Sequence, residues 1–436
     1  MKTSLCDCEN HCPEGQKKDQ YRSSRIFYCI EAALEYFIAI MVGETYLAKI
    51  AGELGASDAL TGVLYAFTSL GCAFQILAIL LSGRSSVKRW VTPMHILNQL
   101  CFTLVYAVPL FEFSKTAKIV LFAALLLLGQ ILSNVAIPAK INWFMSLVDN
   151  EKRGRFTAKK EILSLMGGMV FSFTMGNLID LLEAKGNMKG AFLIGMITVF
   201  ILMLLHTATL LLSKEKRIER KKVSSGRSLI NLLRNKNLRR VIGVSVLWYA
   251  TNYMIMPFTG SYRINELGFS MTFCSVLAIL YSIVRICFSM PMGRLADKRG
   301  FADMLSVCFM IQGCAYLVNI FTVPANGYVF YTVYYTLCSI AAAGITSAQI
   351  NLVYDYVDEE MRMGALAVSN AISGAGGFLV TLAISPVVTL IQKNGNKVLG
   401  IPMYAQQLLS FCGVLMMIVI LLYIRFVLKR KNENRV

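Results

Sequence analysis

The chain has 436 residues, of which 56% are hydrophobic and 16% are charged, and its mean hydropathy is +0.58. Soluble domains are roughly 45–50% apolar, so this composition excludes a water-soluble fold. The formal net charge of +18 would suit a nucleic-acid-binding protein, but the basic residues lie between apolar segments and form no single patch, so we expect no nucleic-acid partner.

Long apolar segments follow one another from residue 26 onward. Residues 1–25 form a polar tail, and the next run is too long and too acidic for a cleavable signal, so we expect a retained helix. A spanning helix needs about 20 mainly apolar residues. The sequence predicts an all-α polytopic membrane protein with twelve spans, near residues 26–48, 60–82, 90–112, 118–146, 160–182, 190–213, 241–263, 271–292, 302–324, 327–352, 364–391 and 401–428.

The connections between these spans differ in their content of Lys and Arg. The two tails and the even-numbered connections together carry about four times as many as the odd-numbered connections. By the positive-inside rule the first set is cytoplasmic, and so are both termini. We expect a monomeric, multi-pass protein embedded in the lipid bilayer of the cell membrane.

The two halves of the sequence resemble each other. Residues 83–89 follow the second span as Gly-Arg-Ser-Ser-Val-Lys-Arg, and residues 293–299 follow the eighth as Gly-Arg-Leu-Ala-Asp-Lys-Arg. After the fourth span, Ile-Asn, Val-Asp, Glu, Arg and Gly-Gly recur at one register after the tenth. Six spans repeated as six give parallel copies. The predicted organisation is a tail at 1–25, six-helix bundles at 26–213 and 241–428, a cytoplasmic linker at 214–240 and a tail at 429–436.

The segment that follows the eighth span resembles a family signature. Residues 293–300 match Gly-x-Leu-Ala-Asp-Arg/Lys-x-Gly, which follows the second span of each half in the major facilitator superfamily (MFS). The first copy departs from it, because Val87 replaces the Asp and no Gly follows Arg89. The resemblance implies secondary transport by alternating access, with a cavity lined mainly by the first, fourth, seventh and tenth spans.

The motif also predicts a gate at the cytoplasmic side. Gly293 would permit a tight turn, and the neighbouring charges would pair when that side closes. An ordinary solvated basic turn is the alternative. The predicted gate residues are Gly293, Arg294, Asp297, Lys298, Arg299, Asp149, Glu151, Arg153, Asp358, Glu360 and Arg362.

Ionised side chains within the spans carry the functional hypothesis, because each costs roughly 2.5–3.5 kcal/mol on insertion scales. Glu31 and Glu35 are four residues apart and share a helix face, and Arg285 lies at a comparable depth. We hypothesise that Glu35, alone or with Glu31, binds a coupling proton or the substrate. Arg285 would be its counter-charge or bind an anionic substrate group, and a permanent salt bridge is the alternative. Lys140 either snorkels to the cytoplasmic surface or attracts anions.

Uncharged polar side chains in the spans are further candidates for the cavity, with interhelical hydrogen bonding as the alternative. They are Gln130, Asn134, Trp248, Asn252, Tyr253, Tyr331 and Tyr335. Glu44 and Asp180 lie near outer helix ends, where we expect water to reach them and assign them no role.

No enzyme motif stands out in the sequence: we find no phosphate-cradling glycine loop and no nucleophile with a base at recognisable spacing. The N-terminal Cys6, Cys8, His11 and Cys12 match no standard zinc spacing, so we expect neither metal nor cofactor. The predicted function is a secondary active transporter of a small organic solute, coupled to a proton or another cation. A non-transporting receptor on the same scaffold and a lipid or drug efflux flippase are the alternatives.

Overall fold

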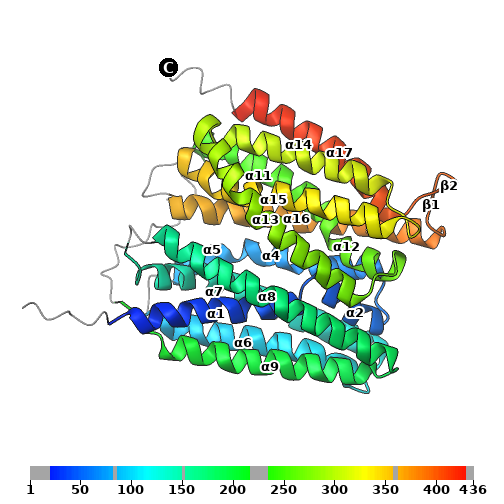
Figure 1. Ribbon diagram of the computed structural model, residues 1–436, viewed down its shortest axis with the longest axis horizontal. Coiled ribbons are helices and arrows are strands. Elements are labelled where there is room, and N and C mark those ends of the chain that lie inside the picture. The colour runs from blue at the N-terminus through cyan, green and yellow to red at the C-terminus, as the bar shows by residue number, and fades with distance from the viewer. Residues whose placement is uncertain (1–19, 82–85, 150–152, 217–233, 357–361, 429–436) are drawn as a thin grey trace, which may run out of the picture.

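The computed structural model describes residues 20–81, 86–149, 153–216, 234–356 and 362–428. Its helices run roughly along one direction and form two groups that lie side by side, α1 to α9 in one and α11 to α17 in the other (Figure 1). The β1–β2 hairpin lies at one end of the bundle, which we call the hairpin end. We call the opposite end, where α1 begins and α17 ends, the terminus end.

The helices of the first group, with one short 3₁₀ segment, are α1 (Arg22–Met41), α2 (Glu44–Glu53), α3 (Asp58–Tyr65), α4 (Phe67–Ala73), α5 (Gln75–Leu81), α6 (Val87–Ala107), η1 (Val108–Leu110), α7 (Lys115–Met145), α8 (Arg153–Ala184) and α9 (Met188–Leu212). The elements of the second group are α11 (Lys236–Ile255), η3 (Met256–Phe258), α12 (Thr259–Ser261), η4 (Tyr262–Glu266), α13 (Met271–Arg299), α14 (Phe301–Ile320), α15 (Gly327–Tyr356), α16 (Arg362–Lys393), β1 (Lys397–Val398), β2 (Ile401–Pro402), α17 (Ala405–Tyr423) and η6 (Ile424–Leu428). The two strands pair antiparallel, with Lys397 opposite Pro402.

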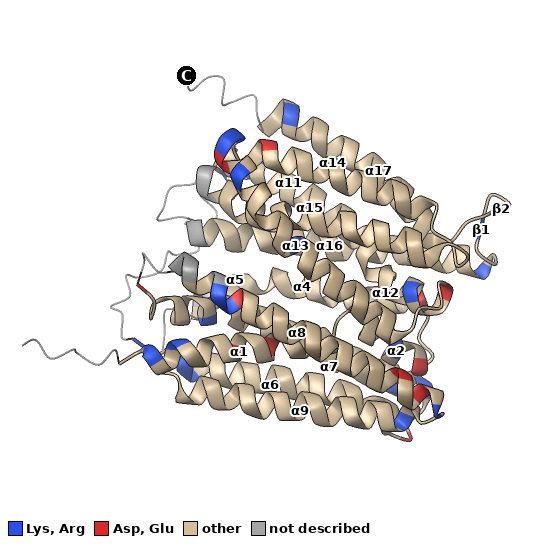
Figure 2. Cartoon of the chain, viewed as in Figure 1, with Lys and Arg blue, Asp and Glu red and all other residues tan. Residues whose placement is uncertain are grey.

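The described part of the chain contains 11 helices long and apolar enough to cross a membrane, or up to 12 if the bent pair of α1 and α2 is one span. The two helices of that pair meet at 41°. Most charged residues lie near the two ends of the bundle, and few lie between them (Figure 2). This confirms the predicted all-α polytopic membrane fold.

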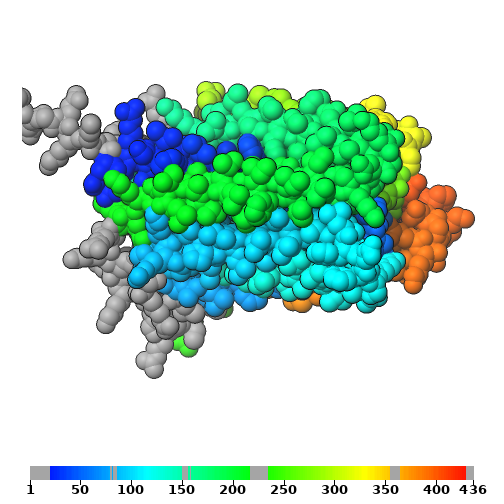
Figure 3. Space-filling model, turned by 90° about the horizontal axis from the view of Figure 1, so that it is seen from below, coloured from blue at the N-terminus to red at the C-terminus, as the bar shows by residue number. Residues whose placement is uncertain are grey.

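Each group of helices packs around its own apolar core. One core comes from residues between Leu238 and Leu428 together with Ala59, and another from residues between Leu34 and Leu202 together with Met271. On the outer face of the first group α6 and α9 pack along their length, with α8 on the far side of α9 (Figure 3). The two cores support the predicted division into halves, whose boundaries stay a prediction.

The signature motif is helical rather than a turn. α13 continues through Gly293 to Arg299, because Arg, Leu, Ala and Lys are good helix formers. The helix ends at Gly300, whose φ of +85° lies in the left-handed region that glycine adopts without strain. The predicted tight turn at Gly293 is therefore wrong, and the turn lies at Gly300.

Candidate functional site

Five ionisable side chains from four helices meet inside the first half. Nζ of Lys140 on α7 lies 2.6 Å from Oε1 of Glu31 and 2.5 Å from Oε2 of Glu35, both on α1. Nε2 of His206 on α9 lies 2.8 Å from Oε1 of Glu31. Nδ1 of His95 on α6 lies 3.9 Å from Oε1 of Glu35. We call these five residues the charge cluster.

One member of the charge cluster is partly exposed. The side chain of Glu35 is 31% exposed, whereas that of Glu31 is 0% and that of Lys140 is 2% exposed. By formal charge, with histidine counted as neutral, the two carboxylates and one ammonium of the cluster sum to one net negative charge. Because an unbalanced charge in a membrane interior is costly, the cluster is suited to take up one further proton or monovalent cation.

Helix direction explains why Lys140 turns inward. Side chains on a helix lean toward its N-terminus. α7 begins near the hairpin end, so Lys140, near its far end, leans back toward the middle of the bundle. α1 runs the other way, and its two glutamates lean toward Lys140. The expectation that Lys140 snorkels to the surface is therefore wrong.

The hypothesised pairing of Glu35 with Arg285 is likewise not found. Glu35 pairs with Lys140, while Nη2 of Arg285 on α13 lies 3.9 Å from Oε1 of Glu161 on α8. α13 packs chiefly against α8, α14 and α15, whereas α1 packs chiefly against α8 and α9. Equal depth along two helices therefore did not identify partners, because the pairing depends on which helices are neighbours.

Sequence reasoning missed the two histidines. His95 and His206 are both buried, their ring centroids are 5.3 Å apart, and neither ring nitrogen of His95 has a hydrogen-bond partner among the described residues. The available signal was their position inside apolar spans, where an ionisable residue is rare. Glu35, His95 and His206 offer three ligand atoms within 4.8 Å of one another. The ammonium of Lys140 beside them would repel a divalent metal, so this arrangement suits proton exchange better than metal binding.

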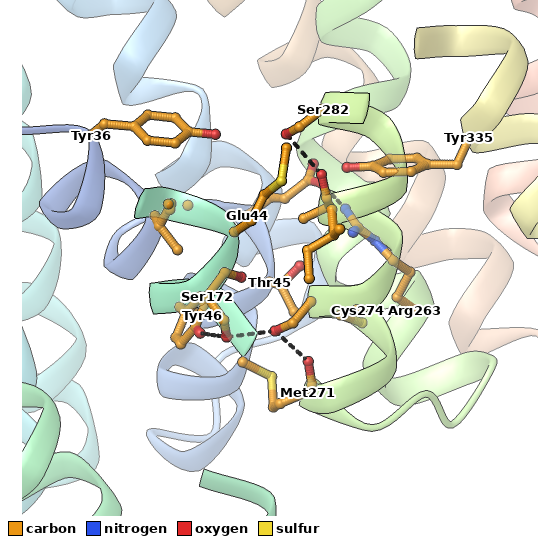
Figure 4. Close-up of a pocket in the computed structure, with 17 residues that line it drawn as sticks. Tyr36, Glu44, Thr45, Tyr46, Ser172, Arg263, Met271, Cys274, Ser282 and Tyr335 are labelled. Atoms are coloured by element: carbon orange, nitrogen blue, oxygen red, sulfur yellow. Dashed lines mark hydrogen bonds and ion pairs between the residues drawn. The ribbon is translucent and has the colours of Figure 1, made fainter. Parts of the chain in front are cut away.

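A cavity of about 150 Å³ lies between the two halves. In Figure 4 the hydroxyl of Tyr36 points across it toward Ser282, and the Arg263 guanidinium lies beneath the ring of Tyr335. The polar residues that line the cavity come from α1, α2, α8, α13, η4 and α15. The lining residues with polar or sulfur-containing side chains are Tyr36, Glu44, Thr45, Tyr46, Met169, Ser172, Arg263, Met271, Cys274, Ser275, Ser282 and Tyr335.

An ion pair between the halves forms part of the lining of this cavity. Arg263 on η4 pairs with Glu44 on α2, and its side chain is 2% exposed. Nε of Arg263 donates a hydrogen bond to the Thr259 carbonyl at 3.3 Å, and the Thr259 hydroxyl donates one to Oε2 of Glu44 at 2.7 Å. Glu44 therefore bonds across the interface, and our expectation that it has no role beyond a wetted helix end is wrong.

Asp180 joins the halves at the hairpin end. Its carboxylate on α8 accepts the backbone N–H of Met271 at 2.9 Å and of Thr272 at 2.7 Å, so it caps α13 of the other half. Nearby, Oδ2 of Asp58 accepts a hydrogen bond from Gln392 at 2.7 Å. The two halves are therefore in contact across the hairpin end, which is closed in this structure.

Of the residues predicted to line a central cavity, Tyr335 lines the cavity described above. Tyr331 is fully buried and stacks on Tyr335 with ring centroids 6.0 Å apart. Asn134 instead links helices of the first half: its Nδ2 donates to the Gln130 carbonyl at 2.9 Å, and its Oδ1 accepts from Gln75 at 3.1 Å. This favours the interhelical role that was the alternative for Asn134.

Each of the three candidates on α11 has a contact in the structure. The ring of Trp248 lies 5.3 Å from that of Phe309, and Asn252 contacts the sulfur of Met256 at 3.6 Å. Tyr253 accepts a hydrogen bond at its carbonyl from Thr381. A role for these three side chains in solute binding stays a prediction.

The predicted gate residues lie at helix ends or outside the described residues. Arg294, Asp297, Lys298 and Arg299 lie on the last turns of α13. Arg153 and Arg362 begin α8 and α16, and Asp149 follows α7. Glu151, Asp358 and Glu360 lie outside the described residues, as do Cys6, Cys8, His11 and Cys12. The gate stays a prediction.

Comparison with known proteins identifies the family. Residues 28–381 match the model of the Major Facilitator Superfamily. The nucleoside transporter NupG superimposes with a TM-score of 0.70 at 14% identity, over 94% of this chain and 100% of that one. The POT family transporter PepTSo gives a TM-score of 0.68 at 12% identity, over 92% and 97% of the two chains.

A D-xylose-proton symporter gives a TM-score of 0.65 at 14% identity, over 91% of this chain and 96% of that one. At these identities the structures establish the fold alone, and no curated protein sequence matches. The family model covers most of the chain, in agreement with the signature at residues 293–300 and the polytopic fold. The chain therefore belongs to the major facilitator superfamily, and it is a multi-pass membrane transporter of small solutes rather than an enzyme.

Proposed function

We propose that this transporter couples solute movement to protons, and that the charge cluster is the proton site. The observation that carries the proposal is the composition of the cluster: two carboxylates share one ammonium, and two imidazoles lie beside them. The hydrogen bond between His206 and Glu31, 2.8 Å long, offers one position for an added proton, and Glu35 offers another. Binding one proton removes the net charge, so the loaded cluster is the form with the smaller electrostatic cost in the membrane.

The proton site is joined to the solute path by adjacent residues of α1. Glu35 contacts Lys140 in the first half, and Tyr36 lines the cavity between the halves. A change in the protonation of Glu35 therefore acts on the helix segment that forms the cavity wall. One of the structurally similar proteins is a D-xylose-proton symporter, which supports proton coupling on this fold.

The proposed orientation places the terminus end in the cytoplasm of a cell whose plasma membrane holds the protein. The excess of Lys and Arg in the tails and even-numbered connections supports it. The structure then corresponds to a state closed to the outside, because the contacts through Asp180, Asp58 and Glu44 lie at the hairpin end. Alternating access would break these contacts and close the terminus end instead.

The coupling proposal is tested with purified protein in proteoliposomes. A thermal-shift screen of metabolites identifies a solute. It begins with nucleosides, peptides and D-xylose, because structurally similar proteins are named as transporters of these compounds. An inward pH gradient should drive accumulation of that solute by the wild type. Glu35→Gln should lose gradient-driven accumulation and retain solute exchange. The cavity stays intact, while Glu31 and Lys140 then balance each other and the cluster has no net charge for a proton to remove.

Glu183→Gln is the matched control. Glu183 is a carboxylate near the end of α8, 45% exposed and paired with Lys49 at 2.5 Å, so its loss should leave accumulation unchanged. Accumulation by Glu35→Gln with the pH dependence of the wild type would refute the proposed role. A ligand that binds but is never accumulated or exchanged by the wild type would favour the receptor alternative.

A further inference from the structure

Arg263 lies at the cavity, and the carboxylate that pairs with it among the described residues, Glu44, belongs to the other half. Its partner Glu44 is 14% exposed, against 2% for Arg263 itself, and holds a second bond to Thr259. The guanidinium also lies 5.7 Å from the ring centroid of Tyr331 and 5.3 Å from that of Tyr335. These rings pack on the guanidinium and leave its N–H edge to donate hydrogen bonds to a carboxylate.

The cavity beside this guanidinium suits a small anion. Its volume of about 150 Å³ is comparable to that of an engineered cavity that binds benzene. Hydroxyl groups of Tyr36, Thr45 and Ser282 line it, and Figure 4 shows the Arg263 guanidinium directed into the same space. A carboxylate with a few further heavy atoms fits this volume, and the hydroxyls of Tyr36 and Thr45 are candidate donors to its remaining oxygen.

We propose that Arg263 binds the oxyanion of a small carboxylate-bearing solute, which takes the place of the Glu44 carboxylate. The exchange keeps one negative group on the buried guanidinium, so it avoids the penalty of an unpaired buried charge. It also breaks the ion pair between α2 and η4. A ligand shifts a conformational equilibrium by its differential affinity for the two states, so the anion favours opening of the hairpin end. This inference deepens the proposed transport function, because it assigns a class of solute to the cavity.

The test replaces the resident carboxylate and supplies a free one. Glu44→Ala leaves Arg263 without its partner and opens room for acetate. Melting of the purified full chain is followed against sodium acetate, with acetamide as the neutral isostere and sodium chloride as the ionic-strength control. Acetate should stabilise Glu44→Ala and bind it at least about tenfold more tightly than the wild type, because the resident competitor is gone. Acetamide and chloride should give no comparable shift.

Two further variants make the result specific. Glu44→Ala/Arg263→Gln removes both charges, which favours folding over an unpaired charge, and should lose the response to acetate. Glu183→Ala breaks the Lys49–Glu183 ion pair and should respond as the wild type does. If Glu44→Ala does not fold, the isosteric Glu44→Gln is measured in its place.

Equal shifts with acetate and acetamide, no gain of affinity in the Glu44 variants, or a response retained by the double variant would each overturn the proposal. The measurement is made at equilibrium without a pH gradient. The acetate measurement can therefore support carboxylate binding even if the coupling experiment shows no proton coupling. Likewise, the coupling experiment can succeed even if acetate does not bind.

Discussion

Removing the ammonium from the charge cluster tests whether it is held by electrostatics. Lys140 contacts Glu31 at 2.6 Å and Glu35 at 2.5 Å. With an effective dielectric constant of about 20, each contact contributes about 6 kcal/mol before desolvation is subtracted. Breaking a buried pair by removing one partner costs a net of about 3–5 kcal/mol, because the remaining charge is left without compensation. Lys140→Met should therefore destabilise the protein by that amount.

Melting of the purified chain in detergent measures this effect. A loss of 1 kcal/mol lowers the melting temperature of a 150–250-residue unit by about 2–4 °C, so we expect a decrease of about 6–20 °C. Lys140→Met/Glu31→Gln should recover a large part of the loss, because it neutralises the fully buried carboxylate. Lys49→Met is the control: its pair with Glu183 is partly exposed and should contribute less than about 1 kcal/mol. The reasoning is refuted if Lys140→Met and Lys49→Met have the same melting temperature. It is also refuted if the melting temperature of the double variant is no higher than that of Lys140→Met.

Three further predictions concern the interface between the halves. Gly374→Ala should destabilise the closed interface by about 1–3 kcal/mol, because the added Cβ would lie 2.5 Å from the Ser69 carbonyl oxygen. The control is Gly376→Ala on the same helix: its Cβ would meet nothing closer than 3.8 Å, so this variant should melt as the wild type does. Asp180→Asn should lower stability by about 1 kcal/mol, because the cap that it places on α13 is weakened; an unchanged melting temperature would contradict this. Glu161→Ala should change stability by less than about 1 kcal/mol, because its contact with Arg285 is 3.9 Å long and both side chains are partly exposed. A loss of stability as large as that of Lys140→Met would contradict this prediction.

The spans and the family could be predicted because each depends on the local sequence. Hydropathy within about 20 residues marks a span, and the signature at residues 293–300 is contiguous. The shared face of Glu31 and Glu35 likewise follows from helical spacing, and the structure places both in one cluster. These inferences hold because none of them needs to know which helices are neighbours.

The partners of those glutamates could not be predicted in the same way. Lys140 reaches them through the packing of α7 near α1 and through the lean of its side chain toward the helix N-terminus. His206 comes from a helix that is 175 residues away along the chain from Glu31. The pair of Glu44 with Arg263 depends on the break between α1 and α2, which turns a helix end into part of the cavity wall.

The net charge of the cluster has a consequence for membrane voltage. A cluster that is neutral when loaded and carries one negative charge when empty feels the electric field only in the empty form. Moving one elementary charge through 100 mV is worth about 2.3 kcal/mol, or about fiftyfold in an equilibrium constant. Under the proposed proton coupling and orientation, an inside-negative potential would drive the empty form back toward the outside. Each cycle would then carry one positive charge inward with a neutral solute, and no net charge with a monovalent carboxylate.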